Sequence, residues 1–292
     1  MDPTRAGHGP PETGPTADDP LAPLFARHGL VVLDGGLATQ LEAQGNSLAD
    51  PLWSARLLLE NPGEIVRAHL AFYRAGAAIA TTASYQATFE GFAARGIDHA
   101  GAIGLLQRSV ALASEARAAW RAERAPDDTG RLFVAASIGP YGAFLANGAE
   151  YTGRYGRTVA ELRAFHRERL EVLVATEADL LACETIPEIE EGLALVELLA
   201  RARSATSKPL IVYPNSGEGW DAVARRWIGG GGPTVDGTIA RRWIEAGATI
   251  VGGCCRVSPG QIEAVAGAVT QLARRTGSAG IDGAGPRRRM DA

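Results

Sequence analysis

Six short apolar runs recur along the chain, and helical patterns lie between them. The runs are rich in β-branched residues and apolar throughout, which is typical of strands buried on both faces. They cover residues 30–33, 78–82, 132–136, 180–183, 210–213 and 249–251. Strands that alternate with helices favour a parallel sheet with helical crossovers, so we expect a doubly wound sheet or a barrel. No Gly-x-Gly-x-x-Gly motif follows the first run, which disfavours a dinucleotide-binding open sheet.

Helix start signals lie between these runs. Asn61 offers an N-cap before Pro62, and Gly76 is placed to end the helix that follows. Capping-box patterns begin at Thr158, Thr185 and Ser258, each with Glu or Gln three residues later. We expect a helix over about 188–203, between the runs at 180–183 and 210–213.

Composition excludes several classes of protein. The 292 residues are 46% hydrophobic and 21% charged, which is typical of a globular chain. The net charge of −4 gives no electrostatic basis for binding nucleic acid. Three cysteines, no apolar run long enough to span a bilayer and no leader pattern favour a soluble protein of the reducing cytoplasm. We expect disordered tails at 1–20 and 277–292 around one domain over 21–276.

Polar residues follow the ends of the predicted strands. They are Asp34, Thr82, Tyr85, Glu184, Asn215, Cys254 and Cys255. Either acid alone could be a helix cap, but the carboxyl ends of parallel strands meet at one edge of a sheet. Their convergence predicts a pocket for a small polar molecule that carries an ammonium group.

The adjacent pair Cys254-Cys255 narrows the chemistry further. Neighbouring Cα atoms lie ~3.8 Å apart, below the ~4.4 Å usual for a disulfide, so the two cysteines do not bridge each other. They are either small apolar packing residues or half of a thiolate metal site, for which zinc is the favoured ion.

Six stretches, in the same order, resemble the homocysteine S-methyltransferases, which use S-methylmethionine, S-adenosylmethionine or betaine as methyl donor. They begin with the Leu-Asp-Gly-Gly of residues 33–36 and end with the Gly-Gly-Cys-Cys-Arg of residues 252–256. The intermediate stretches are 81–86, 136–142, 182–187 and 213–218. Together they extend over nearly all of residues 30–265.

This resemblance implies a TIM-type (β/α)8 barrel in which three cysteine thiolates hold Zn²⁺ against the sulfur of homocysteine. Cys254 and Cys255 would be catalytic metal ligands, and Asp34 and Glu184 would hold the amino group of homocysteine. The pocket lining would include Thr82, Tyr85 and Asn215. The implied reaction transfers a methyl group from a sulfonium donor, S-methylmethionine or S-adenosylmethionine, and yields methionine.

The chain departs from the family between residues 203 and 208. The family has two further βα units there, and the third zinc cysteine follows one of those strands, whereas here the helix at 188–203 runs almost directly into the strand at 210–213. We therefore expect an α/β barrel shortened to about six βα units. Cys183 is next to Glu184, so alternation along a strand should turn it toward the helices and away from the metal.

Several alternatives stay open at this point. The chain could be a noncatalytic homologue without a complete zinc site, acting as a binding or assembly protein. It could also be a phosphate-handling lyase that uses the glycines of 229–232, although a surface loop is the simpler interpretation. His69 and His166 are interpreted as surface or partly buried structural residues. The methyl donor is undetermined, and a homo-oligomer is possible because a shortened barrel leaves strand edges open.

Overall fold

The computed structural model describes residues 31–124, 130–153, 155–187, 189–202, 210–211, 219–221, 226–228, 236–238, 240–241, 250–252 and 257–278. Asn215, Cys254, Cys255 and the glycines of 229–232 lie outside these residues, as do residues 1–20. The last described helix ends at Ser278, so the predicted tail from 277 begins inside it.

Six strands of the described residues are parallel, and each overlaps one of the six predicted runs. They are β1 (Val31–Val32), β2 (Ile79–Thr81), β3 (Phe133–Ile138), β4 (Leu180–Cys183), β5 (Leu210–Ile211) and β8 (Ile250–Val251). Strands β2, β3, β4 and β5 are neighbours in that order, and β1 pairs with β8.

The two sets of strands meet between β1 and β2. Leu33 forms a parallel bridge with Ile79, and the Asp34 amide donates to the Ile79 carbonyl at 3.0 Å. Ala78 N–H donates in turn to the Val32 carbonyl at 2.9 Å. The described residues therefore form an α/β fold with parallel strands in the order β8-β1-β2-β3-β4-β5.

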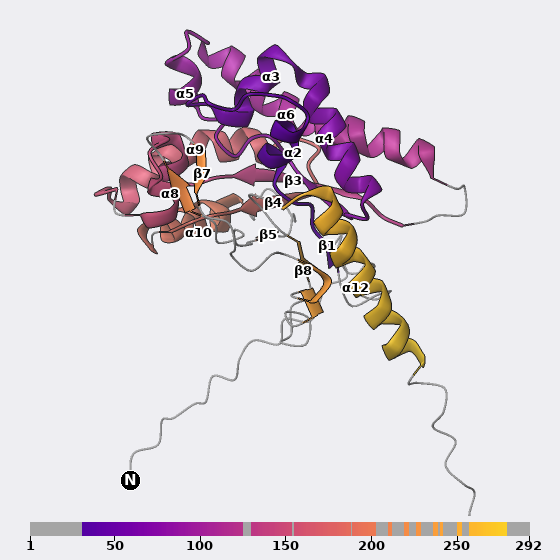
Figure 1. The fold of residues 1–292 in the computed structure, drawn as a ribbon. Helices are drawn as coiled ribbons and strands as arrows, with labels where there is room; N and C mark the ends of the chain where they lie inside the picture. The colour runs from indigo at the N-terminus through magenta and orange to yellow at the C-terminus, as the bar shows by residue number, and fades with distance from the viewer. Residues whose placement is uncertain are drawn as a thin grey trace, which may run out of the picture.

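Helices connect these strands. The first half of the chain contributes α2 (Leu37–Ala43), the 3₁₀ turn η1 (Trp53–Arg56), α3 (Leu57–Glu60), α4 (Pro62–Arg74), α5 (Phe89–Ala93) and α6 (His99–Glu123). The second half contributes α7 (Tyr141–Leu145), α8 (Ala149–Thr152), α9 (Val159–Val174), α10 (Ile189–Ala202) and α12 (Pro259–Ser278). In Figure 1 the indigo and magenta helices α2 to α6 gather over β3 and β4, while α9 and α10 lie together on another side.

The start signals are confirmed in part. Thr158 forms a complete capping box with Glu161 at the start of α9, and the Gln261 side chain accepts from the Ser258 amide at 2.9 Å before α12. The capping box at Thr185 is wrong. Thr185 adopts a left-handed φ of 54°, and α10 begins only at Ile189, so this threonine belongs to the loop after β4.

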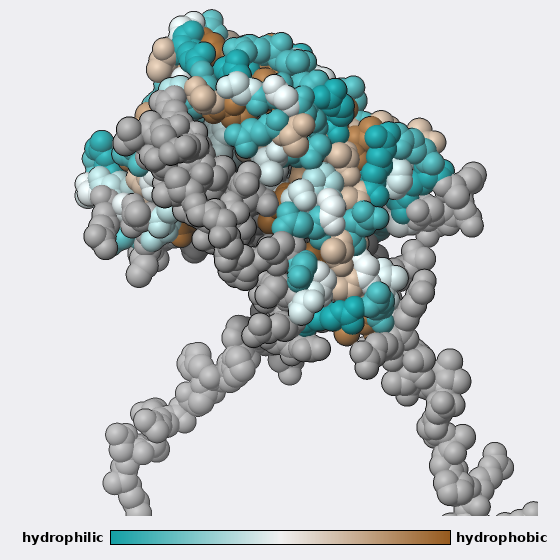
Figure 2. All heavy atoms as spheres, viewed as in Figure 1, coloured by the Kyte–Doolittle hydropathy of each residue, from teal (hydrophilic) through white to brown (hydrophobic). Residues whose placement is uncertain are grey.

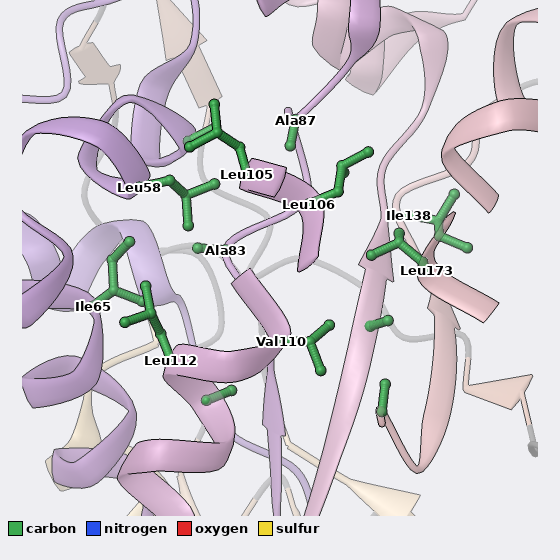
Figure 3. Close-up of a cluster of buried hydrophobic side chains, with 14 of the residues drawn as sticks. Leu58, Ile65, Ala83, Ala87, Leu105, Leu106, Val110, Leu112, Ile138 and Leu173 are labelled. Carbon is green, nitrogen blue, oxygen red and sulfur yellow. The ribbon is translucent and has the colours of Figure 1, made fainter. Parts of the chain in front are cut away.

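Alternate residues of the strands belong to different hydrophobic clusters. One cluster consists of strand residues and contains Val31, Leu33, Ile79, Phe133, Ala135, Leu180 and Ala182. The other joins the alternate residues of β3 and β4 to the helices, and Figure 3 shows part of it, where Leu106 and Val110 of α6 lie near Ile138 and Leu173. A polar residue in register with the first cluster therefore lies on the same face of the sheet as that cluster.

A short antiparallel pair was not predicted. β6 (Gly219–Asp221) and β7 (Arg226–Ile228) pair only with each other among the described residues. Hydrophilic residues dominate the described surface in Figure 2, and Leu59 is the large hydrophobic side chain that stands exposed among the described residues. None of the described helices is long and apolar enough to cross a membrane.

Candidate functional site

Asp34 lies at the carboxyl end of β1 and is fully buried. Its two carboxyl oxygens accept from one residue: the Thr81 amide donates at 2.7 Å and the Thr81 hydroxyl at 2.5 Å. Since Thr81 ends β2, the adjacent strands β1 and β2 hold this carboxyl group in one orientation. Asp34 is therefore a buried group held in place at the carboxyl end of the strands.

The electrostatics of Asp34 favour a proton on its carboxyl group. Burial is the largest cause that raises its pKa, and the negative charge of Glu184 raises it further. The two hydrogen bonds from Thr81 lower it, and the net result is a pKa of about 8. A cation placed beside Asp34 would favour its ionised form and replace the solvation that burial removes.

Glu184 directly follows β4 and is 3% exposed. The Ser137 hydroxyl of β3 donates to Glu184 Oε1, and the Glu184 amide donates to the Ile138 carbonyl at 3.3 Å. Thr185, the next residue, has a positive φ, which is uncommon for a β-branched side chain. The chain thus turns sharply after Glu184 and leaves its carboxyl group inside the sheet.

Thr82 and Tyr85 lie on the loop that follows β2. The Thr82 hydroxyl accepts from the Ser137 amide at 3.0 Å. It also lies 2.7 Å from the Ser84 hydroxyl. The Ser84 hydroxyl in turn donates to the Ser137 carbonyl at 2.7 Å. Both hydroxyl groups are buried. Ser137 therefore connects the loop after β2 to the Glu184 carboxyl group.

These residues border one pocket at the carboxyl end of the strands. It is lined by Gly35, Gly36, Leu37, Ala38, Trp53, Ser54, Thr81, Thr82, Tyr85 and Glu184. Four of the predicted positions thus come together, since Asp34 immediately precedes the first lining residue and binds another, Thr81. Its glycine and aromatic walls suit a small molecule whose charged end lies toward Glu184.

Sequence reasoning missed Trp53 and Ser54, because both lie in η1, far from any strand end. The available signal was the helix-breaking Asp50-Pro51 pair before them, which predicts a turn there. Trp53 has a φ of 48°, so its backbone is held in the left-handed region at the edge of the pocket.

Cys254 and Cys255 lie outside the described residues, but the residues on either side are anchored. A Cβ atom added to Gly252 would lie 2.4 Å from Leu33 Cβ, so only glycine fits there. The Gly36 amide donates to the Val257 carbonyl at 2.8 Å. Both anchors contact the 33–36 segment that carries Asp34.

Cys183 is the remaining cysteine, and it is buried among apolar side chains of the helix-facing cluster. Burial raises the pKa of its thiol to about 12, so the sulfur keeps its proton at neutral pH. The predicted orientation toward the helices is confirmed. Among the described residues there is no group of three or more His, Cys, Asp or Glu side chains that could bind a metal.

The family model described as homocysteine S-methyltransferase matches residues 31–207 and 199–269. The chain belongs to the homocysteine S-methyltransferase family. The homocysteine S-methyltransferase of Escherichia coli is 42% identical over 85% of this chain and 98% of its own length. The Arabidopsis thaliana homocysteine S-methyltransferase 1 is 38% identical over 81% of this chain and 92% of its own length.

Solved structures of a homocysteine methyltransferase are also similar to this chain. The metallated form of the Escherichia coli homocysteine methyltransferase MmuM has a TM-score of 0.72 and 39% identity, with 85% of this chain and 99% of that chain covered. The apo form of the same enzyme has a TM-score of 0.63 and 33% identity, with 86% and 100% covered.

The two parts of the family match overlap at residues 199–207, which begin within the last turn of α10 and end before β5. The alignment with the Escherichia coli relative runs over 305 positions, but 85% of 292 residues is about 248, so about 57 positions have no residue of this chain. This homocysteine S-methyltransferase homologue thus contributes fewer residues to the alignment than the Escherichia coli relative does.

Proposed function

We propose that this chain transfers a methyl group from a sulfonium donor, S-methylmethionine or S-adenosylmethionine, to the sulfur of homocysteine, which yields methionine. The observation that carries the proposal is a pocket lined by the buried Glu184, with the buried Asp34 bound to Thr81 of the same lining. The two carboxyl groups suit the amino group of an amino acid substrate, and the family's relatives are homocysteine S-methyltransferases.

Asp34 and Glu184 would bind the ammonium group of homocysteine. An ammonium beside two carboxylates offsets the repulsion between them and lowers the raised pKa of Asp34. Charge-assisted hydrogen bonds of this kind are stronger than neutral ones and fix direction. The bound amino acid would therefore present its sulfur in one direction, past Thr82 and Tyr85.

The methyl transfer itself is a displacement at carbon. The homocysteine thiol first loses its proton to solvent, and the thiolate sulfur then attacks the methyl carbon of the donor. The bond between that carbon and the donor sulfur breaks, and its electron pair stays on the donor sulfur, which becomes a neutral thioether. Thr82, Tyr85 and Trp53 would hold both reactants in line and exclude water, which supplies much of the rate.

Zn²⁺ is the metal that fits the donor set of the proposed site. Cys254 and Cys255 would hold it as thiolates, since Cys183 stays a buried, protonated thiol. When bound, Zn²⁺ lowers the pKa of a coordinated thiol and so keeps homocysteine as a thiolate at neutral pH. Gly252 and Val257 are anchored beside Asp34, so the two cysteines are at most two residues from segments that border the pocket. Asn215 is a further candidate for the pocket lining.

We propose a TIM-type barrel of about six βα units over residues 21–276 as the scaffold, with 1–20 and 277–292 as tails. The strand order β8-β1-β2-β3-β4-β5 supports this, because it is the order in which a barrel places successive strands. A homo-oligomer would protect strand edges that a shorter sheet leaves open. Free thiols require a reducing compartment such as the cytoplasm.

Metal analysis with and without homocysteine tests the proposal. We expect about one zinc per chain in the presence of homocysteine and loss of that zinc in Cys254→Ala and Cys255→Ala variants. Turnover with S-methylmethionine and with S-adenosylmethionine then identifies the donor. Absence of zinc after reconstitution, together with absence of turnover, would instead identify a noncatalytic homologue.

A further inference from the structure

A buried charged network lies behind the pocket wall and was not expected from the sequence. Arg169, His166 and Glu191 are each at most 1% exposed. The interpretation of His166 as a surface or partly buried residue is therefore wrong, as is that of His69, which is also fully buried. Arg169 and His166 come from α9 and Glu191 from α10. None of the three lines the substrate pocket.

The hydrogen bonds fix the state of each member. Arg169 Nη2 lies 2.8 Å from His166 Nδ1, and a guanidinium can only donate, so Nδ1 is the acceptor. His166 Nε2 therefore carries the proton and donates to Glu191 Oε1 at 2.7 Å. Burial lowers the pKa of His166 to about 4, in agreement with a neutral ring between a cation and an anion.

The network ends on the main chain of the loops that follow β2 and β3. Arg169 Nη2 donates to the Gly139 carbonyl at 2.6 Å, and Nη1 reaches the Tyr85 carbonyl at 3.5 Å. At the other end, Glu191 accepts from the Tyr141 amide at 2.5 Å. One connected group of charges thus binds both loops.

The two loops are also packed closely against each other. A Cβ atom added to Gly139 would lie 2.5 Å from the Tyr85 carbonyl oxygen and 2.6 Å from the Tyr85 ring. A displacement of Gly139 therefore also displaces Tyr85, whose side chain lines the pocket. Arg169 contacts the carbonyl groups of both residues and does not itself line the pocket.

We propose that Arg169 is a positioning residue of the methyl-transfer site, which, with His166 and Glu191, holds the main chain of Gly139 and Tyr85 and thereby the Tyr85 wall of the pocket. The part that concerns substrate binding rests on the proposed function. The part that concerns the two loops does not.

Arg169→Lys is the sharpest variant, because lysine keeps the buried charge but cannot reach two carbonyl groups with a planar fork. Arg117→Lys is the matched control. Arg117 Nη1 donates to Asp179 at 2.6 Å, and Asp179 also accepts from the Val134 amide, at the amino ends of β3 and β4. The control therefore alters a partly buried ion pair between Arg117 and Asp179, on the same sheet but away from the pocket.

Hydrogen exchange of the full chain without substrate is the first measurement. We expect amides of residues 82–87 and 139–143 to exchange at least about tenfold faster in Arg169→Lys than in the wild type, with no such change in Arg117→Lys. Equal exchange in Arg169→Lys and the wild type would overturn the proposal, as would the same acceleration in the control.

Kinetics with homocysteine and the methyl donor are the second measurement. Because the wall contacts substrate in the ground state and the transition state alike, the KM for homocysteine should rise about tenfold while kcat changes less than about threefold. Arg169→Met, which leaves Glu191 without its cation, should show the larger effect. A wild type that neither binds nor methylates homocysteine would refute the proposed function, while the exchange data would still decide the role of Arg169.

Discussion

Thr81 binds both oxygens of the Asp34 carboxyl group, yet burial and the charge of Glu184 still raise the pKa of that group to about 8. The two effects oppose each other, and the increase is the larger, so without a ligand the carboxyl group is mainly protonated at neutral pH. Arrival of an ammonium group would decide its state. This balance makes Asp34 sensitive both to ligand and to pH.

Asp34→Asn should weaken homocysteine binding by about 10- to 100-fold, since a charge-assisted hydrogen bond contributes about 1.5–3 kcal/mol. Titration calorimetry with the metal-loaded protein measures the change. Glu184→Gln should act in the same direction. Glu60→Gln, at an exposed side chain of α3, is the control and should leave the affinity unchanged. Equal affinities of Asp34→Asn and the wild type would exclude Asp34 as an amino-group ligand.

The stability of the protein should depend on pH through Asp34. Its folded-state pKa of about 8 is above the ordinary value of 3.8, so the protonated form stabilises the fold at low pH and this contribution is lost as the pH rises between the two values. Urea unfolding of the wild type and Asp34→Asn across this range tests the sign. The variant should gain stability relative to the wild type with rising pH; a falling difference would contradict the prediction.

Gly35→Ala should destabilise the protein by about 1–3 kcal/mol, because the added methyl group overpacks a closed contact. Its Cβ atom would lie 2.4 Å from the Val257 carbonyl oxygen, which is main chain and cannot rotate away. Gly104→Ala in α6 is the matched control: no atom lies within 4 Å of its added Cβ. It should stabilise the helix by about 0.5–1 kcal/mol. Thermal unfolding of both variants distinguishes these outcomes.

Cys183→Ala should leave the metal content unchanged, since its thiol is buried among apolar residues and stays protonated. Loss of the sulfur should cost about 1 kcal/mol of stability through the small cavity. Elemental analysis beside Cys254→Ala measures the contrast. A Cys183→Ala protein that loses its metal would identify Cys183 as a ligand after all.

The parallel strands were predictable because burial on both faces leaves a plain apolar signal, as at Leu180 and Leu181. Their polar end residues Asp34, Thr82, Tyr85 and Glu184 could be predicted from parallel-sheet geometry, and the structure brings them to one pocket. The antiparallel pair of β6 and β7 could not be predicted, because strands of three residues show no useful periodicity.

Two errors have physical causes. Thr185 matches a capping box in sequence, but the sharp turn that keeps Glu184 inside the sheet delays the helix by a turn. From sequence alone we interpret His166 as a surface or partly buried residue, although its spacing from Leu162 and Leu173 puts it on their buried face of α9. Polar residues in a buried helical stripe were the available signal.

The pairing of β1 with β8 has a consequence for synthesis of the chain. A ribosome releases Val31 about 220 residues before its partner Ile250, which at 5–20 residues per second is roughly 10–40 s. During that interval the loop of Asp34 lacks the Val257 carbonyl that holds Gly36. The loop that borders the substrate pocket is therefore completed only after residue 257 has been synthesised, and until then one edge of β1 lacks its partner strand.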